Sequence, residues 1–300
     1  MTRLPERPDP APITSPRSDR VRRIAALSGR SARRRTGLLR VDGPQAVRSL
    51  LSERAADARE LFLTEAADAA HPELRELAER AGIRPRTVAE EIIRAMARSD
   101  DADHGADDVA TPQGAIAVAA RPADDWSTAL GALPDSGPLT LLVLAEVRDP
   151  GNVGTLVRAA DAAGADLVVL SRASADPWGP KAIRASAGSA FHLPVVTGAP
   201  LPELLEALAA RGIAVAATSG HADADLFELE LPGRLAWVMG NEARGVDEET
   251  LAAADLAVRI PLAGRAESLN VATAATVCLF ETLRQRHGGI RTGAAGSATP

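Results

Sequence analysis

Short apolar runs recur along the carboxyl-terminal half of the chain, and most of them are separated by segments with helical periodicity. The runs are LTLLVLAEV, DLVVL, FHLPVV, IAVAATS, LAWVMG and LAVRIPL. Strands that are apolar almost throughout and that alternate with helices are typical of a parallel sheet covered by helices on both faces. The pattern therefore predicts an α/β domain over residues 138–287.

Residues 20–120 show the same alternation on a smaller scale. LLRV, ELFLTEA and GAIAVAA have the pattern of strands, and PQAVRSLLSERA, PELRELAERA and AEEIIRAMAR have the pattern of helices. This predicts a second, smaller α/β domain. The polar, Pro-bearing segment 121–137 is typical of a linker, and composition predicts a disordered basic tail at 1–19 and a flexible tail at 288–300.

Composition narrows the class of protein. A single cysteine, Cys278, excludes a disulfide framework within the chain and a cysteine-based zinc site. No apolar run approaches the roughly 20 residues of a membrane span, and the amino terminus is charged where a signal peptide would be apolar. The histidines show no ligand spacing. We therefore expect a cytoplasmic protein with no membrane partner and no metal.

Charge is distributed unevenly along the chain. The formal net charge is −6, yet residues 1–40 hold eleven arginines and only three acidic residues. Arg30, Arg33, Arg34 and Arg35 form the densest cluster, and guanidinium forks suit RNA phosphates. On charge alone, an RNA contact and a solvated surface without a partner remain equally open interpretations.

Three polar segments follow strands of the second domain, at the end where ligands of parallel sheets bind. They are DPGNVGTLVR at 149–158, MGNEARG at 239–245 and IPLAGRAESLN at 260–270. The first lacks the third glycine of a dinucleotide fingerprint and the Gly-Lys-Ser/Thr of a phosphate loop. These segments are the candidate site.

In this order the three segments resemble the three motifs of the SpoU (TrmH-type) RNA 2'-O-ribose methyltransferases. The amino-terminal domain resembles, more loosely, the L30e-like substrate-binding domain that many members of this family carry, with Leu39 and Asp42 in place of the usual aromatic residue and Glu. The residues that match the three motifs are Asn152, Gly154, Arg158, Gly240, Asn241, Glu242, Ser268, Leu269 and Asn270.

The resemblance implies a SPOUT fold, in which the carboxyl-terminal segment of the parallel-sheet domain forms a trefoil knot, an exception to the general rule against knotted chains. It also implies a homodimer, and S-adenosylmethionine as the cofactor bound in the knot. The cofactor-binding positions that it implies are Gly240, Asn241, Ile260 and Leu269. To these we add Thr218 and Ser219, because they end the preceding strand.

Methyl transfer from a sulfonium to a ribose hydroxyl needs closely aligned reactants and no metal. The resemblance implies that Arg158 is catalytic. A guanidinium is a poor base, so phosphate orientation and charge stabilisation is the role that we favour, and the general base stays open. The resemblance further implies that Asn152 positions Arg158 or the ribose, that Glu242 orders the loops, and that Ser268 and Asn270 bind hydroxyl or phosphate.

Purely structural roles are open for several of these residues. By residue type, Asn152 and Ser268 suit helix N-caps, and Arg158 and Glu242 could be surface charges. Trp178 could stack on a base or pack against its own domain. Cys278 lies in an apolar helical segment and is predicted to be a buried thiol.

The sequence therefore predicts an enzyme that methylates a ribose 2'-hydroxyl of RNA. The L30e-like domain favours ribosomal RNA over transfer RNA, and no DNA partner is expected. Two alternatives remain: a nucleotide-dependent enzyme on an ordinary doubly wound sheet, and a non-catalytic RNA-binding factor for ribosome assembly. The incomplete glycine pattern GNVG disfavours the first, and the presence of every motif residue disfavours the second.

Overall fold

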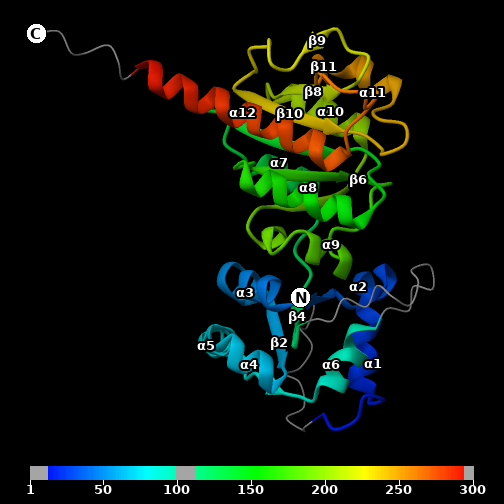
Figure 1. Cartoon of the computed structure of the whole chain (residues 1–300), viewed down its shortest axis with the longest axis vertical. Helices are drawn as coiled ribbons and strands as arrows, with labels where there is room; N and C mark the ends of the chain where they lie inside the picture. The colour runs from blue at the N-terminus through cyan, green and yellow to red at the C-terminus, as the bar shows by residue number, and fades with distance from the viewer. Residues whose placement is uncertain (1–12, 99–112, 294–300) are drawn as a thin grey trace, which may run out of the picture. The chain divides into compact units, whose positions relative to one another are not determined.

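The computed structural model describes residues 13–98 and 113–293, with side chains through residue 287 (Figure 1). Its contacts divide the chain into two compact units. Unit 1 takes Met1–Pro122 and Trp178–Phe191, and unit 2 takes Ala123–Pro177 and His192–Pro300. Of the two predicted tails, residues 1–12 and 294–300 lie outside the described residues. The end of the tail predicted at 1–19 is ordered instead, because Ser18 caps a helix that begins at Asp19. A helix continues through residues 288–293, where we predicted a flexible tail.

Unit 1 is built on a mixed sheet with the strand order β1-β4-β2-β3. Strand β4 pairs antiparallel with both β1 and β2, and β3 pairs parallel with β2. The strands are β1 (Leu38–Asp42), β2 (Ala58–Leu63), β3 (Arg86–Thr87) and β4 (Ala115–Ala120). The helices are α1 (Asp19–Ala25), η1 (Ala26–Ser28), α2 (Arg30–Thr36), α3 (Pro44–Glu53), η2 (Ala55–Asp57), α4 (Glu65–Ala70), α5 (Pro72–Arg80), α6 (Glu90–Ala97), α9 (Pro180–Ala185) and η3 (Ser189–Phe191).

The structure confirms the strands and helices predicted for this region, with one correction. The predicted strand ELFLTEA ends at Leu63. Its last residues begin α4 instead, because the Thr64 hydroxyl accepts a hydrogen bond from the Ala67 amide at 3.1 Å and caps the helix.

A buried ion pair on β1 holds several parts of unit 1 together. The Arg40 guanidinium is 1% exposed and donates to both carboxylate oxygens of Asp42, at 2.8 and 3.0 Å. It also donates to the carbonyls of Met96, Ala97 and Arg98, which end α6. Arg40 therefore caps the carboxyl terminus of α6, where a cation also complements the helix dipole. Asp42 in turn accepts from Arg184 of α9 at 3.4 Å.

Unit 2 is built on a sheet in which every pairing is parallel, with the strand order β7-β6-β5-β10-β8-β11-β9. This confirms the predicted parallel sheet. The strands are β5 (Leu139–Leu144), β6 (Leu167–Ser171), β7 (Val195–Ala199), β8 (Ala214–Thr218), β9 (Ala224–Asp225), β10 (Arg234–Met239) and β11 (Leu256–Arg259). The helices are α7 (Trp126–Gly131), α8 (Pro150–Ala162), α10 (Leu201–Ala210), α11 (Glu248–Ala253) and α12 (Val271–Gly293).

Helices cover both faces of this sheet (Figure 1). Leu130 of α7 and Leu204 of α10 pack against alternate strand residues such as Val143 and Val238. On the opposite face, the indole of Trp237 donates to the Thr282 hydroxyl of α12 at 2.9 Å, and α12 packs along α8. No helix in the described part of the chain is long and apolar enough to cross a membrane.

The segment 121–137, predicted as a linker, is largely part of unit 2. From Ala123 onward it belongs to that unit, and it contains α7. Trp126, Leu130 and Leu133 pack on the same apolar core as α10. These apolar residues keep a helical spacing over only a short stretch, which Pro and polar residues interrupt. The composition therefore indicated a linker, although burial of the apolar side chains stabilises a helix here.

The Arg40–Asp42 pair leads to a test of stability. Replacing Asp42 with Ala leaves the Arg40 guanidinium buried without a carboxylate, and we expect the free energy of unfolding to fall by about 3–5 kcal/mol. Urea denaturation followed by circular dichroism measures the change. The matched control is Asp68→Ala, which removes a partly exposed ion pair with Arg75 and should cost about 1 kcal/mol or less. Equal losses in the two variants would show that burial does not amplify the Arg40–Asp42 interaction.

Candidate functional site

The strand register of unit 2 brings the first two motif segments together. Met239 of β10 pairs with Leu144 of β5, so the chain segments that follow these two strands start side by side. Likewise Thr218 of β8 pairs with Val258 of β11. The segments after β5, β8, β10 and β11 therefore meet at the carboxyl ends of the strands, where parallel α/β proteins bind their ligands.

Glu242 ties the second motif segment to the first. Its carboxylate accepts hydrogen bonds from the backbone amides of Arg148 and Asp149, both at 3.3 Å, and from Nδ2 of Asn152 at 3.1 Å. Three donors from one segment thus converge on one side chain of the other. This is the geometry of a clamp between the two loops.

Asn270 connects the third motif segment to the same cluster. Its Nδ2 donates to Oδ1 of Asn152 at 3.2 Å, and its own Oδ1 accepts from the amides of Ala272 and Thr273 at 2.9 and 3.4 Å. Asn270 therefore caps α12 while it contacts the first motif. The side chains of Asn152, Glu242 and Asn270, predicted from three separate segments, form one hydrogen-bonded group.

The structure decides against helix capping as the role of Asn152. Asp149 is the N-cap of α8, and its carboxylate accepts from the Asn152 amide at 2.9 Å. Asn152 lies within the first turn of the helix, which leaves its side-chain amide for Glu242 and Asn270. Ser268 is not the cap of α12 either, because Asn270 has that role.

Two opposing effects act on the pKa of Glu242. Partial burial raises the pKa, because it disfavours the charged form. Hydrogen bonds from the Asn152 side chain and from backbone amides, among them those of Asp149 and Arg148, stabilise the carboxylate and outweigh burial. The pKa of Glu242 therefore lies below its usual value, and the group is a carboxylate at neutral pH.

A cavity of about 280 Å³ lies beside this group, at the carboxyl ends of β8, β10 and β11. Glu242, Ser268 and the apolar side chains of Val258, Leu262 and Val271 take part in its lining. The lining includes every residue predicted to bind the cofactor: Thr218, Ser219, Gly240, Asn241, Ile260 and Leu269.

The wall of this cavity requires glycine at position 240. A Cβ placed there would lie 2.1 Å from the backbone carbon of Gly245 and 2.2 Å from the amide nitrogen of Val246. The two strands of this loop are held together by reciprocal backbone hydrogen bonds between Asn241 and Gly245, at 2.8 and 2.9 Å. Glycine thus permits the close backbone approach that shapes the loop.

Sequence reasoning missed Glu146. Its backbone has φ +60°, in the left-handed region that a glutamate seldom occupies, and two hydrogen bonds hold it there. Its amide donates to the Ser171 hydroxyl at 2.9 Å, and its carbonyl accepts from Nδ2 of Asn241 at 3.0 Å. The available signal was a charged residue two positions after a strand that is apolar except for Thr140.

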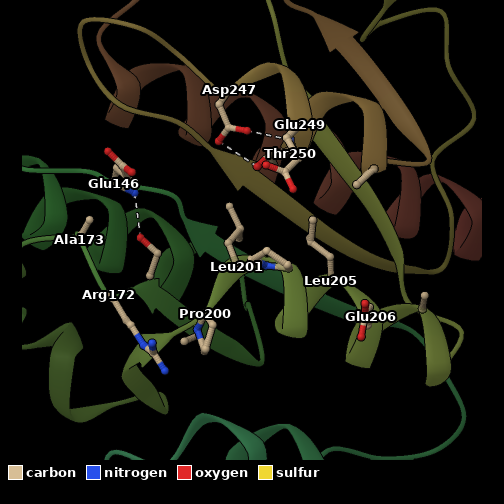
Figure 2. Close-up of a pocket in the computed structure, with 15 residues that line it drawn as sticks. Glu146, Arg172, Ala173, Pro200, Leu201, Leu205, Glu206, Asp247, Glu249 and Thr250 are labelled. Atoms are coloured by element: carbon tan, nitrogen blue, oxygen red, sulfur yellow. Dashed lines mark hydrogen bonds between the residues drawn. The ribbon is translucent and has the colours of Figure 1, made fainter.

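A larger cavity of about 520 Å³ lies between α10 and α11 and includes Glu146 in its wall (Figure 2). Figure 2 shows Leu201 and Leu205 pointing from α10 toward α11. The charged residues of its lining are four carboxylates and one guanidinium: Glu146, Glu206, Asp247, Glu249 and Arg172. No residue predicted for the site lines this cavity, whereas every predicted cofactor residue lines the smaller one. The smaller cavity is therefore the candidate cofactor site.

Arg158 lies apart from the hydrogen-bonded group. It is exposed on α8 and has no hydrogen bond or ion pair among the residues that the structure describes. Since an α-helix advances about 100° per residue, Arg158 lies about 120° around the helix axis from Asn152. The expected contact by which Asn152 would position Arg158 is not formed within one chain.

The basic cluster needs one correction. Arg33 is 3% exposed, and its guanidinium donates to the carbonyls of Leu27 and Ser28, so it cannot meet an RNA phosphate. Arg34 and Arg35 are exposed on α2, and Arg30 is half-buried at its start. The helix turns one guanidinium of the run inward and leaves the others at the surface.

Trp178, for which two interpretations were open, and Cys278, which was predicted to be a buried thiol, are both buried. Trp178 is 1% exposed and packs on Phe191 with ring centroids 6.3 Å apart, so it cannot stack on a base. Cys278 of α12 is fully buried, which raises the pKa of its thiol to about 12 and makes it inert as a nucleophile. Within the described residues, no group of three or more His, Cys, Asp or Glu side chains could hold a metal ion.

Comparisons with known proteins point in one direction. Residues 139–280 match the family model described as the SpoU rRNA Methylase family. The 23S rRNA (guanosine(2553)-2'-O)-methyltransferase RlmP of Bacillus subtilis is 38% identical over 188 residues, which are 63% of this chain and 72% of that protein. A 23S rRNA (guanosine-2'-O-)-methyltransferase RlmB of Burkholderia sp is 38% identical over 208 residues, 69% and 80% of the two chains.

Solved structures are similar to most of the chain. The SpoU methyltransferase AviRb from Streptomyces viridochromogenes, in complex with the cofactor AdoMet, has a TM-score of 0.75 and 29% identity over 90% of this chain and 99% of that one. An RNA 2'-O ribose methyltransferase has the same TM-score and identity over 92% and 100%.

The contacts of Glu242 generate a test that needs no substrate. Glu242→Ala removes the acceptor of the Arg148 and Asp149 amides, and we expect these amides to exchange with deuterium about fivefold faster, as for a loss of about 1 kcal/mol. Exchange measured residue by residue checks this, with the exposed Glu248→Ala as the matched control.

The same comparison has a pH dependence of known sign. Because the pKa of Glu242 is lowered in the folded chain, its contacts are fully present at neutral pH and are lost as the pH falls through that lowered pKa. The wild-type and Glu242→Ala exchange rates should therefore converge at acid pH. Identical rates at neutral pH would show that the carboxylate does not hold the loop.

Proposed function

The chain belongs to the SpoU rRNA methylase family, and we propose that it transfers the methyl group of S-adenosylmethionine to a ribose 2'-hydroxyl of ribosomal RNA. The observation that carries this proposal is the cavity at the carboxyl ends of β8, β10 and β11. It gathers every predicted cofactor residue, and it adjoins the hydrogen-bonded group of Asn152, Glu242 and Asn270.

The cavity fits the cofactor in its chemistry. The close approach at Gly240 gives a wall of bare backbone, whose amides and carbonyls suit the edge of an adenine.

 

Ile260, Leu262 and Leu269 line the apolar side of the cavity, which suits the adenine ring and the hydrocarbon parts of the cofactor. Thr218, Ser219 and Ser268 would supply hydroxyls for its ribose and carboxylate. When bound, the cofactor supplies an electrophilic methyl group on a sulfonium.

We infer that the residues of this chain align the ribose and do not remove the proton of its 2'-hydroxyl group. The 2'-oxygen must attack the methyl carbon in line with the breaking carbon–sulfur bond, and the hydroxyl proton must leave. Glu242 is poorly suited to take that proton, because its lowered pKa makes it a weak base and its oxygens already accept three hydrogen bonds. We assign Glu242 to holding the loops, and Arg158 to orienting a phosphate and stabilising charge.

The names of the relatives support ribosomal RNA over transfer RNA. RlmP and RlmB are named as 23S rRNA guanosine methyltransferases, and a relative from Streptomyces viridochromogenes, 37% identical over 210 residues, as a 23S rRNA uridine methyltransferase. The shared chemistry is therefore the ribose hydroxyl and not one base. Ribosomal RNA of bacteria is modified in the cytoplasm, where we place the reaction, and Arg30, Arg34 and Arg35 are the RNA contacts that we retain.

We also propose a homodimer and a trefoil knot, both implied by the family. Phe280 is 44% exposed on α12, and a second copy of the chain would remove this apolar surface from water. A partner could also bring the exposed Arg158 to a neighbouring site. The knot is supported by the path of α12, which follows β11 near one edge of the sheet and packs on the central strand β10.

A substitution at Arg158 distinguishes an enzyme from a protein that only binds RNA. We expect Arg158→Ala to lower methyl transfer to ribosomal RNA at least about a hundredfold, the scale of a lost transition-state contact, while cofactor binding stays unchanged. Arg158→Lys should restore little, because an ammonium lacks the planar fork. Transfer of tritiated methyl groups to RNA measures the loss, and Arg172→Ala, another exposed arginine of unit 2, is the matched control. A fully active Arg158→Ala variant would remove Arg158 from the catalytic machinery.

Gly240 tests the cofactor cavity itself. Gly240→Ala places a methyl group against the Gly245 backbone, so we expect affinity for S-adenosylmethionine to fall at least about tenfold, or 1.4 kcal/mol. Calorimetric titration measures this affinity. Gly264→Ala is the control in the third motif segment, because a Cβ at Gly264 meets no atom within 4 Å. Unchanged affinity of the Gly240→Ala variant for S-adenosylmethionine would show that the cofactor binds outside this cavity.

A further inference from the structure

Unit 1 contains a cavity of about 480 Å³ between α1, α2 and the sheet. Its floor is apolar and includes Ile24, Leu27, Leu38 and Val118. Its charged residues are three arginines and one glutamate: Arg20, Arg23, Arg35 and Glu60. The volume lies within the range of pockets that take small organic ligands.

The single carboxylate of this cavity is already neutralised. Glu60 forms an ion pair with Arg20, whose guanidinium also lies over the Phe62 ring, 5.8 Å from its centroid. Arg23 and Arg35 are exposed, and neither has a hydrogen bond or ion pair in the part of the chain that the structure describes. Two exposed guanidinium groups that form no ion pair with the described residues therefore border an apolar floor.

The surroundings of the cavity strengthen the positive potential. The segment 19–36 holds seven arginines and one acidic residue, Asp19, which pairs with Arg22. The whole chain, by contrast, carries a net charge of −6. An anionic ligand would therefore be drawn to this part of unit 1 rather than to the acidic remainder of the protein.

The described part of unit 1 offers no exposed Phe, Tyr or Trp ring on which a base could stack. Phe62 is the only aromatic residue among residues 1–122, and it is fully buried. Trp178 and Phe191, which also belong to unit 1, are buried as well. Proteins that bind unpaired RNA stack bases on aromatic rings, including imidazole, or on arginine planes, and of these groups the lining of this cavity contains only guanidinium groups.

We propose that this cavity takes one unpaired nucleotide of the RNA substrate. The base packs on the apolar floor against the planar guanidinium groups of Arg23 and Arg35, and the adjoining phosphates meet the positive rim. The inference rests on the proposed function, because it assumes that RNA is the substrate. It adds Arg23 and a shaped cavity to the exposed arginines predicted from sequence.

The test separates a shaped site from charge alone. Arg23→Ala combined with Arg35→Ala should weaken binding of transcribed 23S rRNA about tenfold or more, the value of one lost stacked base, and should flatten its salt dependence. Ala32→Met fills the cavity from α2 without changing the charge and should also weaken binding. The control is Arg80→Ala combined with Arg84→Ala, two exposed arginines of unit 1 outside the cavity.

Each outcome bears on the proposal. Filter binding with and without added salt, on variants with wild-type circular dichroism, should show losses for the Arg23/Arg35 pair and for Ala32→Met but not for the control. Equal losses for the two arginine pairs would reduce the effect to net charge and overturn the proposal. Unchanged RNA binding by the Ala32→Met variant would show that no nucleotide occupies the cavity and would overturn the proposal. Absence of methyl transfer by the wild type would instead refute the proposed function, and RNA affinity would still decide the cavity.

Discussion

The position of β10 between β5 and β8 is the constraint from which the candidate site follows. The chain forms β5, β6 and β7 in one direction across the sheet and then returns to place later strands on the other side of β5. Because Met239 pairs in parallel with Leu144, two segments about a hundred residues apart in sequence begin side by side at the carboxyl ends of their strands. Glu242 can reach the first motif only because of this register.

The clamp and the cavity are two consequences of the same close approach. Gly240 allows the backbone to fold tightly against Gly245, and the narrow loop that results presents Asn241 to the Glu146 carbonyl and Glu242 to the start of α8. Glu146 has to accept a left-handed backbone to meet Asn241, a conformation of the kind that persists where the surrounding structure over-determines it. The strain and the site therefore have one origin.

The sequence was sufficient for the parallel sheet, most helices and the meeting of the three motif segments, because apolar periodicity and polar strand ends are local signals. It was not sufficient for α7 or for the place of Trp178–Phe191 in unit 1, because these depend on distant partners. Nor could it show that Asn152 pairs with Glu242 and Asn270 and not with Arg158. Those contacts require the strand order, which periodicity does not encode.

The arginines show why charge must be placed before it is interpreted. Arg33 and Arg40 satisfy backbone carbonyls inside unit 1, where a guanidinium can supply several donors at once, whereas Arg34 and Arg35 face solvent one residue or a few residues away. In the sequence all four belong to one basic stretch. The fold divides that stretch into two kinds of arginine. A buried guanidinium stabilises the domain only if its N–H donors find acceptors within the protein, and an exposed guanidinium can contact RNA only if its donors are not already bonded within the protein.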